Sequence, residues 1–426
     1  MGRIQKNIKQ TYWGKVDRFI KRQLQQVQSG GWPIFSRKLL MLLYVIAALP
    51  VVLIIRLLRP FIVIRFRQLF SAHIGHYAGN TEIYLCERDA GINVPSHPFI
   101  DIWYHMPFVC NSQLKKMWNR TLHIWPAAVV KPVDQLNRFL PLGEAHIISW
   151  RDQVRDVYNL LERTPPHLTF LPEEEEQGQS GLREIGVPEG ASFVCFHARD
   201  SAYTKTVFQN FDASYHDYRD ANVNNYVLAA EELTIRGYYV IRMGSAVKES
   251  LRVSNPKIID YATNGHRNDF MDIYLCAKCN FFIGSGSGID VIAEIFRRPL
   301  VLVNNVPLEY VRSWNTGHLH ISKKYWLRTE QRFMTFREIL ESGAGRFLRT
   351  QQYVDRGVEL IDNTPEEIVA VVIEMDDRLK GTWQTTAEDE EMQRSFRTLF
   401  PKSELNGQMV SRIGTEFLRQ HREWLE

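Results

Sequence analysis

The sequence is poor in cysteine. Its 426 residues include five cysteines, an odd number, at positions 86, 110, 195, 276 and 279. Most of them lie in apolar, strand-like segments, which argues against a disulfide-stabilised scaffold and favours a reducing compartment. Cys276 and Cys279 have the spacing of half a zinc or redox site. No second cysteine or histidine pair lies near them, so two packed thiols are the simpler interpretation.

Several other signals are absent. The net charge of +4 is too small to indicate nucleic acid as a partner, and there are no internal repeats or low-complexity tracts. The glycine-rich segments match neither the GxxxxGK(S/T) loop nor the GxGxxG loop, which disfavours a P-loop ATPase and a dehydrogenase. No Asp-x-Asp pair ends a predicted strand, so we expect no metal and no other cofactor.

The N-terminus is basic and then apolar. The first 38 residues carry nine Lys or Arg residues and the single acid Asp17, and residues 8–28 mix aromatic with basic side chains. Residues 39–55 are uninterrupted apolar sequence, short for a membrane-spanning helix and containing Pro50. No cleavage site follows, which argues against a cleaved signal peptide. We favour attachment to a membrane surface; a spanning helix and a buried core helix remain alternatives.

Length and composition predict more than one domain, with sizeable cores. Two prolines at 165 and 166, an acidic run and a Gly/Ser stretch indicate a linker. The expected regions are a helical membrane-associating segment (1–59), an N-terminal α/β domain (60–172), a linker (173–190), a C-terminal α/β domain (191–385) and C-terminal helices (386–426).

The first half is predicted to be α/β with short strands. Residues 71–80 bear glycine and histidine and predict a loop, whereas residues 155–163 have helical spacing. The strands expected here are residues 61–66, 82–86, 123–126 and 146–148.

The second half alternates strands with helices, which predicts a parallel, doubly wound sheet. Gly237 and Pro299 stop two of the helices, and Thr364 with a following proline and two acids starts a late one. The expected strands are residues 193–196, 238–243, 281–284 and 300–303, and the expected helices are residues 223–236, 270–277 and 289–296.

A basic pair ends the first of these strands. His197 and Arg199 are two residues apart, so on a strand they share one face. The guanidinium of Arg199 can bind a diphosphate through two hydrogen bonds and stabilise a leaving nucleoside diphosphate. The alternative is an ion pair between Arg199 and Asp200 that closes the strand.

A glycine-serine loop follows the strand at 281–284. Residues 284–288 read Gly-Ser-Gly-Ser-Gly. Small residues let backbone N–H groups approach a phosphate, and the hydroxyls of Ser285 and Ser287 add donors beside Gly286 and Gly288. The alternative is a capped helix start, with Ser287 as N-cap and Asp290 three residues on.

Other polar residues are expected at the same edge of the sheet. Arg242 and Gly244 end the strand at 238–243. The loop before the helix at 223–236 contains Tyr218, Arg219 and Asp220, which suit a sugar or an acceptor hydroxyl, although a surface loop would look the same.

The first half offers candidates for a general base. His73, His76, Asn80 and Glu82 cluster after the first strand, and Asp101 follows a second polar segment. We consider Glu82, Asp101 and His76 as catalytic candidates together with Arg199, and nothing in the sequence selects among the possible bases.

Two of these motifs carry a family resemblance. The His-x-Arg motif that ends a strand, and residues 272–288, resemble the motifs of fucosyltransferases that use GDP-fucose, the α1,6- and protein O-fucosyltransferase group. Asp200 stands where that group usually has a second basic residue. The chain as a whole resembles uncharacterised bacterial glycosyltransferase-like proteins, with which it shares the Ile-Gly-His segment at 74–76.

The resemblance implies a GT-B arrangement, in which two Rossmann-like, doubly wound domains face a cleft and the nucleotide lies mainly on the C-terminal domain. It implies that Arg199 holds the β-phosphate and that His197 and Asp272 lie at the nucleotide, with Asp272 a candidate for guanine recognition. Ser285, Ser287 and Gly288 would line the phosphates.

The expectation is therefore a metal-independent glycosyltransferase. Its donor would be a nucleotide diphosphate sugar, with GDP favoured, and its acceptor a glycan or lipid-linked glycan of bacterial surface polysaccharide. The expected location is the cytoplasmic face of the inner membrane. A sugar-nucleotide epimerase and a non-catalytic scaffold of the same fold are the alternatives.

Overall fold

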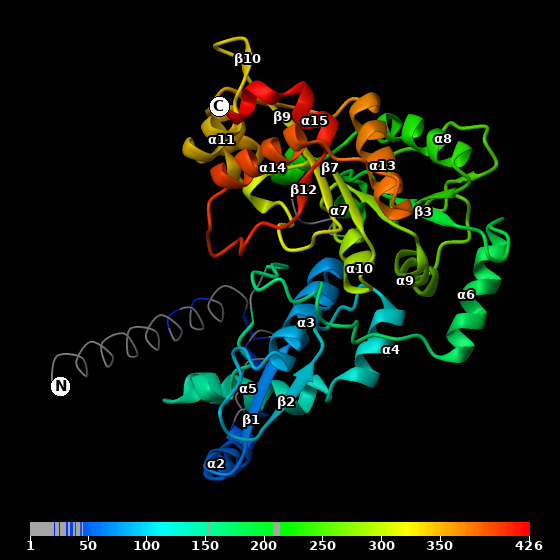
Figure 1. Ribbon diagram of the computed structural model, residues 1–426. Helices are drawn as coiled ribbons and strands as arrows, with labels where there is room; N and C mark the ends of the chain where they lie inside the picture. The colour runs from blue at the N-terminus through cyan, green and yellow to red at the C-terminus, as the bar shows by residue number, and fades with distance from the viewer. Residues whose placement is uncertain are drawn as a thin grey trace. The chain divides into compact units, whose positions relative to one another are not determined.

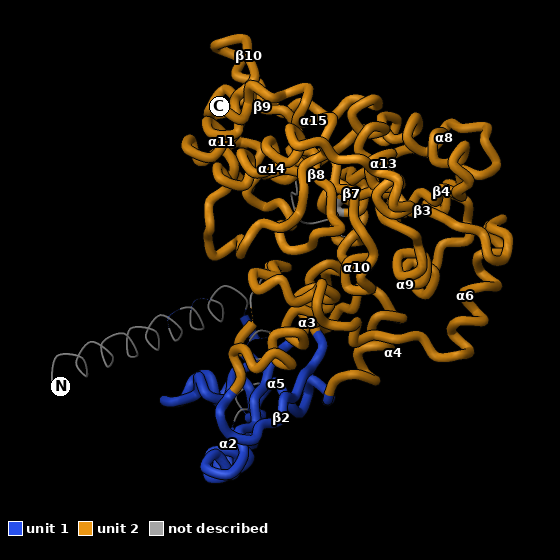
Figure 2. Tube along the Cα trace, in the orientation of Figure 1, with its two compact units in different colours: residues 1–68, 95–105, 123–148 blue, residues 69–94, 106–122, 149–426 orange. Residues whose placement is uncertain are grey.

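The computed structural model describes residues 46–150, 153–207 and 214–426, and isolated positions between 21 and 44. The chain forms two compact units (Figure 2). Unit 1 comprises residues 1–68, 95–105 and 123–148, and unit 2 comprises residues 69–94, 106–122 and 149–426. The chain therefore passes between the units several times, whereas we expected contiguous domains divided near residue 173. Most of the predicted basic segment at 1–38, including residues 1–20, lies outside the described residues.

Unit 1 is built on a two-stranded parallel sheet. Strands β1 (Val63–Gln68) and β2 (Phe99–Tyr104) pair in register from Val63 with Phe99 onward. Helices α2 (Leu49–Leu58) and α5 (Ala127–Phe139) and the 3-10 helix η1 (Gly143–His146) complete its described part. The strand expected at 61–66 is confirmed as β1, which begins two residues later. The segments expected as strands at 123–126 and 146–148 each form only one β-bridge, at Ile124 and Ile147.

The core of unit 1 lies between α2, α5 and the two strands. Val52 and Ile55 of α2 pack with Phe66 of β1, Ile102 of β2 and Val133 of α5. Among the described residues of unit 1, the parallel sheet has two strands. This sheet is smaller than the doubly wound sheet expected for the first domain.

Unit 2 contains a parallel sheet of seven strands (Figure 1), which confirms the expected α/β class. Every neighbouring pair in it is parallel. Across the sheet the strands are β12 (Arg412–Ile413), β8 (Leu319–Ser322), β7 (Leu300–Asn305), β6 (Phe282–Gly284), β3 (Phe193–Phe196), β4 (Tyr239–Arg242) and β5 (Ile258–Ile259).

The strand order is that of a doubly wound nucleotide-binding fold. Strands β4 and β5 lie on one side of β3, and β6, β7 and β8, which come later in the chain, lie on its other side. This is the strand order 3-2-1-4-5-6, which reverses between β3 and β6. Phe196 of β3 packs toward α8 (Val227–Ile235), whereas the thiol of Cys195 contacts α9 (Asp269–Lys278), so helices cover both faces.

Helix α3 (Ile74–Asp89) corrects two predictions, because it replaces both the expected loop at 71–80 and the expected strand at 82–86. It packs on α10 (Asp290–Ile295) through Gly75 and Gly79. A Cβ added at Gly79 would lie 2.4 Å from Val154 Cγ1 and 2.8 Å from Val291 Cγ1. The glycines that look like loop residues in the sequence therefore allow two helices to approach closely.

Two further segments differ from expectation. Residues 173–190 contain α6 (Pro172–Glu184) instead of a linker, since the glutamates of the acidic run fall in its first turn, where they favour a helix. Residues 155–163 are not helical. The guanidinium of Arg155 there donates to the backbone oxygens of Leu405, Tyr310 and Val311, which holds the segment on the unit 2 core.

The rest of unit 2 completes the sheet and covers it. Helix α13 (Pro365–Lys380) begins at the predicted cap, Thr364, which forms a capping box with Glu367, and its apolar side joins α8 in the main core. The small antiparallel sheet is β10 (Arg332–Phe333), β9 (Lys324–Leu327) and β11 (Val358–Ile361). The remaining helices are α4 (Ser112–Thr121), α7 (Ala202–Val207), α11 (Phe336–Glu341), α12 (Thr350–Asp355), α14 (Ala387–Leu399) and α15 (Thr415–Gln420), with 3-10 helices η2 (Ser214–Arg219), η3 (Val223–Tyr226), η4 (Leu308–Tyr310), η5 (Ala344–Arg346) and η6 (Arg422–Leu425).

The apolar run at 39–55 lies partly in α2, which has ten residues. Within the described part of the chain, none of the helices combines the length and the apolar character that crossing a bilayer requires.

Replacing Gly79 by alanine is expected to lower the free energy of unfolding by about 1–3 kcal/mol, because the added Cβ overlaps two valine side chains. This loss exceeds the gain of up to ~1 kcal/mol in helix propensity. Urea unfolding followed by circular dichroism measures it. The double variant Gly79→Ala/Val154→Ala should lose less than the two single changes together, and a Gly79→Ala protein more stable than wild type would contradict this packing.

Candidate active site

The strand ends predicted to bind phosphate are neighbours at the point where the strand order reverses. β3 pairs with β6, and His197 and Arg199 follow β3 while residues 284–288 follow β6. In doubly wound sheets, ligands bind at this reversal, beyond the carboxyl ends of the strands. The structure thus brings together the two motifs that the sequence placed about ninety residues apart.

Arg199 is held in a defined position. Its guanidinium forms an ion pair with Asp220 and donates to the backbone oxygen of His216 at 3.2 Å. Its backbone N–H donates to Ser285 Oγ at 2.9 Å, which ties the end of β3 to the glycine-serine loop. The predicted alternative, a pair with Asp200, is absent from the described contacts, because Asp200 instead accepts backbone N–H groups of Ala202 and Lys248.

The glycine-serine loop is fixed by side chains on both sides. Arg219 donates to the backbone oxygen of Gly286, and Ser287 Oγ lies 3.1 Å from Nδ1 of His197. Gly286 has a φ of +72°, which favours glycine. The buried side chain of Asn305, at the end of β7, lies beside Gly286, and its Nδ2 has no partner among the described residues. That amide is a ready donor for a ligand at this loop.

Part of the loop serves packing instead of phosphate binding. The backbone N–H of Ser287 donates to Asp290 Oδ2 at 2.6 Å, so this group is already used. A Cβ added at Gly75 would lie 2.9 Å from Gly288 Cα, so Gly288 allows α3 to approach the loop. Ser287 is not the N-cap of α10, whose cap position is Ile289. We therefore keep Ser285, Gly286 and Ser287 as ligand candidates and explain Gly288 by packing.

Two lysines that sequence reasoning missed join this group. Lys248 Nζ lies 3.2 Å from Asp220 Oδ2. Lys323 Nζ donates to the backbone oxygen of Asp220 at 2.6 Å and pairs with Asp362 Oδ1 at 2.9 Å. Lys323 directly follows β8, which reads Leu-His-Ile-Ser, and this alternation of apolar and polar residues was the signal that could have identified the strand. Together with Arg199 and Arg219, these lysines form what we call the cation cluster.

The two histidines of the site are neutral at pH 7. Burial is the largest cause that lowers the pKa of His197 and of His216 to about 4. Repulsion from neighbouring arginines, including Arg199, acts in the same direction, and Asp200 opposes it at His197. Burial and the neighbouring Arg219 also lower the pKa of Arg199. The positive charge of the site is therefore that of its arginines and lysines, not of its histidines.

Arg242 and Gly244 have structural roles in the described chain. The buried guanidinium of Arg242 donates to the backbone oxygen of Glu249 at 2.7 Å and to Asp260 Oδ2 at 3.2 Å, so it holds the loop after β4. Gly244 has a φ of +156°, and a Cβ added there would lie 2.7 Å from Val247 Cγ1. Both shape the edge of the sheet beside β3.

Asp272 and Tyr218 are also engaged. Asp272 lies buried in the first turn of α9 with Oδ2 2.7 Å from Arg267 Nη2, and burial, opposed by Arg267, raises its pKa to about 6. Guanine recognition by Asp272 would require this ion pair to open. The ring of Tyr218 is buried against Tyr353 and fixes the turn that carries Arg219 and Asp220.

The general bases expected from the first half are held in structural contacts. Asp101, in unit 1, receives two hydrogen bonds from Arg65, at 2.7 and 2.9 Å. Glu82 is fully buried in unit 2, 2.6 Å from Arg297 Nη2 and 3.1 Å from His167 Nδ1. His76 lies 3.4 Å from the side-chain amide of Asn80. Glu82 and Asp101 would have to break buried ion pairs to accept a proton.

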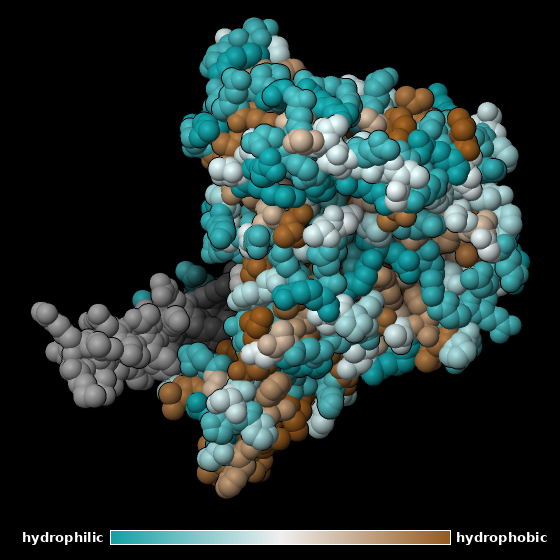
Figure 3. Space-filling model, viewed as in Figure 1, coloured by the Kyte–Doolittle hydropathy of each residue, from teal (hydrophilic) through white to brown (hydrophobic). Residues whose placement is uncertain are grey.

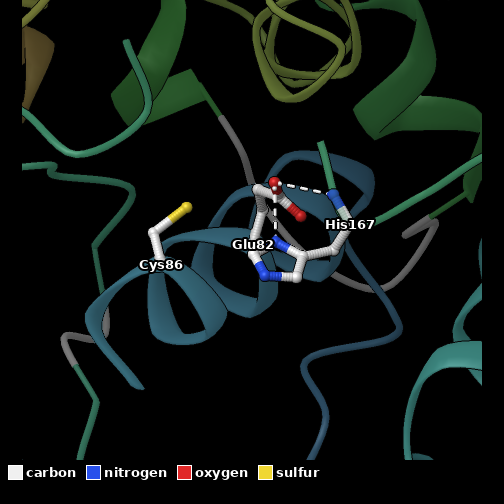
Figure 4. Close-up of side chains that lie close together, drawn as sticks. All are labelled: Glu82, Cys86 and His167. Carbon is white, nitrogen blue, oxygen red and sulfur yellow. Dashed lines mark hydrogen bonds and ion pairs between the residues drawn. The ribbon is translucent and has the colours of Figure 1, made fainter. Parts of the chain in front are cut away.

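Glu82, Cys86 and His167 form a group with the donor types of a metal site (Figure 4). The Arg297 guanidinium, however, already contacts both Glu82 and the Cys86 thiol. Burial alone would lower the pKa of His167, but hydrogen bonds to the neighbouring Cys86, Glu82 and Asp89 outweigh it and raise the pKa to about 10. The guanidinium of Arg297 and the protonated ring of His167 thus place two positive charges where a metal ion would bind. We interpret the group as a buried ion-pair network.

Asp217 is a carboxylate that sequence reasoning did not single out. It lies in η2 between His216 and Tyr218, it is exposed, and its side chain makes no hydrogen bond or ion pair with any described residue. Burial and the neighbouring Asp220 raise its pKa above the usual range, while Lys205, Arg199 and Lys248 act in the opposite direction. An accessible carboxylate beside the cation cluster can accept a proton.

Comparison with known proteins finds similarity at the level of solved structures. No protein-family model matches the chain, and no curated protein matches it. A glycosyl transferase family 9 protein from Veillonella parvula DSM 2008 aligns with 74% of this chain and 96% of its own, at 11% identity and a TM-score of 0.42. E. coli ADP-heptose LPS heptosyltransferase II aligns with 61% and 90%, at 12% identity and a TM-score of 0.34. The iron-containing glycosyltransferase TibC from enterotoxigenic E. coli H10407 aligns with 57% of each chain, at 12% identity and a TM-score of 0.28. At these TM-scores the site geometry, and not the likeness, carries the functional argument.

The network around His167 predicts a pH-dependent stability. The folded pKa, about 10, lies above the unfolded value near 6.5, so the stabilisation is complete below about pH 6.5 and is lost as pH rises toward 10. We expect a loss of about 1–3 kcal/mol in the free energy of unfolding over this window, measured by urea denaturation at a series of pH values. His167→Gln should flatten this part of the profile. An equally steep decline in the variant would show that other groups cause it.

Proposed function

We propose that this protein is a metal-independent glycosyltransferase that uses a nucleotide diphosphate sugar. The observation that carries the proposal is the cation cluster of Arg199, Arg219, Lys248 and Lys323 beside the glycine-serine loop. Arg199 follows β3, Lys323 follows β8, and Arg219 contacts the loop after β6. The strand order reverses between β3 and β6, which favours ligand binding there. Fixed positive charge at this place suits a diphosphate.

The chemistry follows from charge. When the bond between the sugar C1 and the diphosphate oxygen breaks, the electron pair leaves with the nucleoside diphosphate, which gains negative charge. Arg199 and the lysines would stabilise that charge without a metal ion. Ser285 and Ser287 hydroxyls and the unpartnered Nδ2 of Asn305 supply further hydrogen bonds. His197, neutral at pH 7, would donate a hydrogen bond without adding charge.

We assign the general base to Asp217 in place of Glu82 and Asp101. The acceptor hydroxyl would transfer its proton to the carboxylate as its oxygen attacks C1. Asp217 is accessible, and its raised pKa improves proton acceptance relative to an ordinary aspartate. Glu82 and Asp101 are each neutralised by a buried arginine contact.

The base of the nucleotide and the acceptor belong to the same proposal. GDP is favoured by the resemblance of residues 272–288 to GDP-fucose-dependent enzymes, and a glycan or lipid-linked glycan of the bacterial surface is the proposed acceptor. An epimerase would form product without any acceptor, and a scaffold of this fold would bind no nucleotide. An assay for product without acceptor and an assay for nucleotide binding therefore separate these alternatives.

Arg199→Ala is expected to weaken binding of the preferred nucleoside diphosphate by about 10- to 100-fold, because a charge-assisted contact is lost. A thermal-shift panel of GDP, UDP, CMP, ADP and dTDP identifies the ligand, and titration calorimetry gives the ratio of dissociation constants. Arg328→Ala removes an exposed arginine that pairs with Glu359 and should bind as wild type does. Wild-type protein that is folded yet shifted by none of the five nucleotides would support the scaffold instead.

Asp217→Asn is expected to reduce kcat for sugar transfer by about 10²- to 10⁴-fold while donor binding stays intact. In wild type the rate should fall on the acid side of the pH profile as the carboxylate is protonated, and this limb should vanish from any residual activity of the variant. Glu82→Gln serves as the comparison, since it should lower the unfolding midpoint and leave kcat of the folded protein near wild type. If Glu82→Gln lowered kcat of the folded protein and Asp217→Asn did not, Glu82 and not Asp217 would be the general base.

A further inference from the structure

Helix α2 exposes apolar side chains on its outer side. Val52 and Ile55 face the unit 1 core, whereas seven other apolar residues in and just after the helix are exposed. We call these seven residues the α2 face: Leu49, Val51, Leu53, Ile54, Leu57, Leu58 and Phe61. Their exposed fractions run from 40% for Leu58 to 76% for Leu57 and Phe61.

The α2 face differs from the outer side of an ordinary surface helix, which carries polar residues. The only polar residue of α2 is Arg56, and its guanidinium turns into unit 1. It donates to the Asn137 side chain at 3.2 Å and to the Pro141 backbone oxygen at 2.7 Å. The outer side of the helix is therefore entirely apolar. Figure 3 shows apolar surface gathered at the end of unit 1 that α2 occupies.

Neighbouring segments of unit 1 add to this surface. Helix α5 packs against α2, and its Val129 and Phe139 are 58% and 44% exposed. Leu142 follows α5, beside the Pro141 oxygen that Arg56 binds, and is 71% exposed. The surface of a soluble protein normally carries exposed apolar residues singly, whereas here several lie together. Such a patch indicates an interaction site.

The charge of the surrounding sequence identifies the partner. Between residues 18 and 81 the chain has no Asp or Glu and nine Lys or Arg residues, of which Arg56, Arg65 and Arg67 are engaged by other residues of unit 1. Arg59, which follows α2 directly, is exposed. Basic residues around an apolar helix match an anionic lipid surface, where each one near the headgroups adds attraction.

The geometry also selects the mode of binding. A helix of ten residues is about 15 Å long, half the thickness of the hydrocarbon core of a bilayer. Val52 and Ile55 are already buried in protein, so only one side of α2 is available to lipid. We propose that unit 1 binds an anionic bilayer with α2 in the plane of the membrane and the α2 face inserted among the lipids. This inference does not depend on the proposed glycosyl transfer.

Flotation of the full-length protein with vesicles tests the proposal. Wild type should float with vesicles of phosphatidylcholine and phosphatidylglycerol, and more weakly with phosphatidylcholine alone or at high salt. Leu57→Glu/Phe61→Glu places two charges at exposed positions, so folding should be retained, and it should lower the apparent partition coefficient by about 100-fold. Arg59→Glu should reduce binding only to the anionic vesicles.

A matched control uses apolar residues of unit 2 that are equally exposed. Ile235 and Val354 are 80% and 60% exposed, and Ile235→Glu/Val354→Glu should float as wild type does. If Leu57→Glu/Phe61→Glu also floats as wild type does, the proposal is overturned, and the basic N-terminus suffices. If wild type ignores vesicles but elutes as a dimer that this variant dissociates, the α2 face binds a second copy and the proposal also fails. Nucleotide-induced thermal shifts of the same variants report separately on the proposed transferase site.

Discussion

The buried carboxylate of Asp290 determines the shape of the candidate site. It accepts the backbone N–H of Ser287 at 2.6 Å, pairs with the guanidinium of Arg312, and lies where a Cβ at position 284 would be. Arg312 also pairs with Glu294, whose second oxygen accepts from Trp314. A buried carboxylate is costly unless it is paired, so these contacts must form together. The loop between β6 and α10 is thereby fixed before any ligand arrives, and it cannot slide along the sheet.

On the other side of the loop, Asp220 keeps cations close together that would otherwise repel one another. Its side chain faces Arg199 and Lys248, and its backbone oxygen accepts from Lys323. Lys323 also pairs with Asp362 at 2.9 Å, so two carboxylates hold three cations in fixed positions beside the glycine-serine loop. Side chains that are already oriented toward a binding site need little rearrangement when a charged ligand binds, so little free energy is spent on reorganisation. This is the advantage of fixed side chains for a reaction in which charge develops on a diphosphate.

The two halves of the sequence differed in how much of the fold they revealed. In unit 2, short buried strands such as β3 are followed by helices and glycine or proline stops, so local patterns sufficed to predict the parallel sheet. In α3, buried Glu82 and the glycines at 75 and 79 are explained only by partners far along the chain, Arg297 and Val291 among them. The same limit applies to the site. His197, Arg199 and the loop at 284–288 were predictable as strand ends, whereas Lys323 acquires its place through β8, which the sequence did not reveal.

The cation cluster and the α2 face lie in different units of the chain. In unit 2 the cation cluster is arranged for a soluble, charged ligand, and in unit 1 the α2 face offers no polar group at all. A transferase that joins a water-soluble donor to a lipid-linked acceptor needs both kinds of surface in one protein, since no single surface can suit a diphosphate and a hydrocarbon chain. Under the proposed sugar transfer and the proposed membrane binding, the presence of both surfaces in one chain favours an acceptor carried at a membrane over a free sugar, and membrane binding gives the absence of acids between residues 18 and 81 a physical reason.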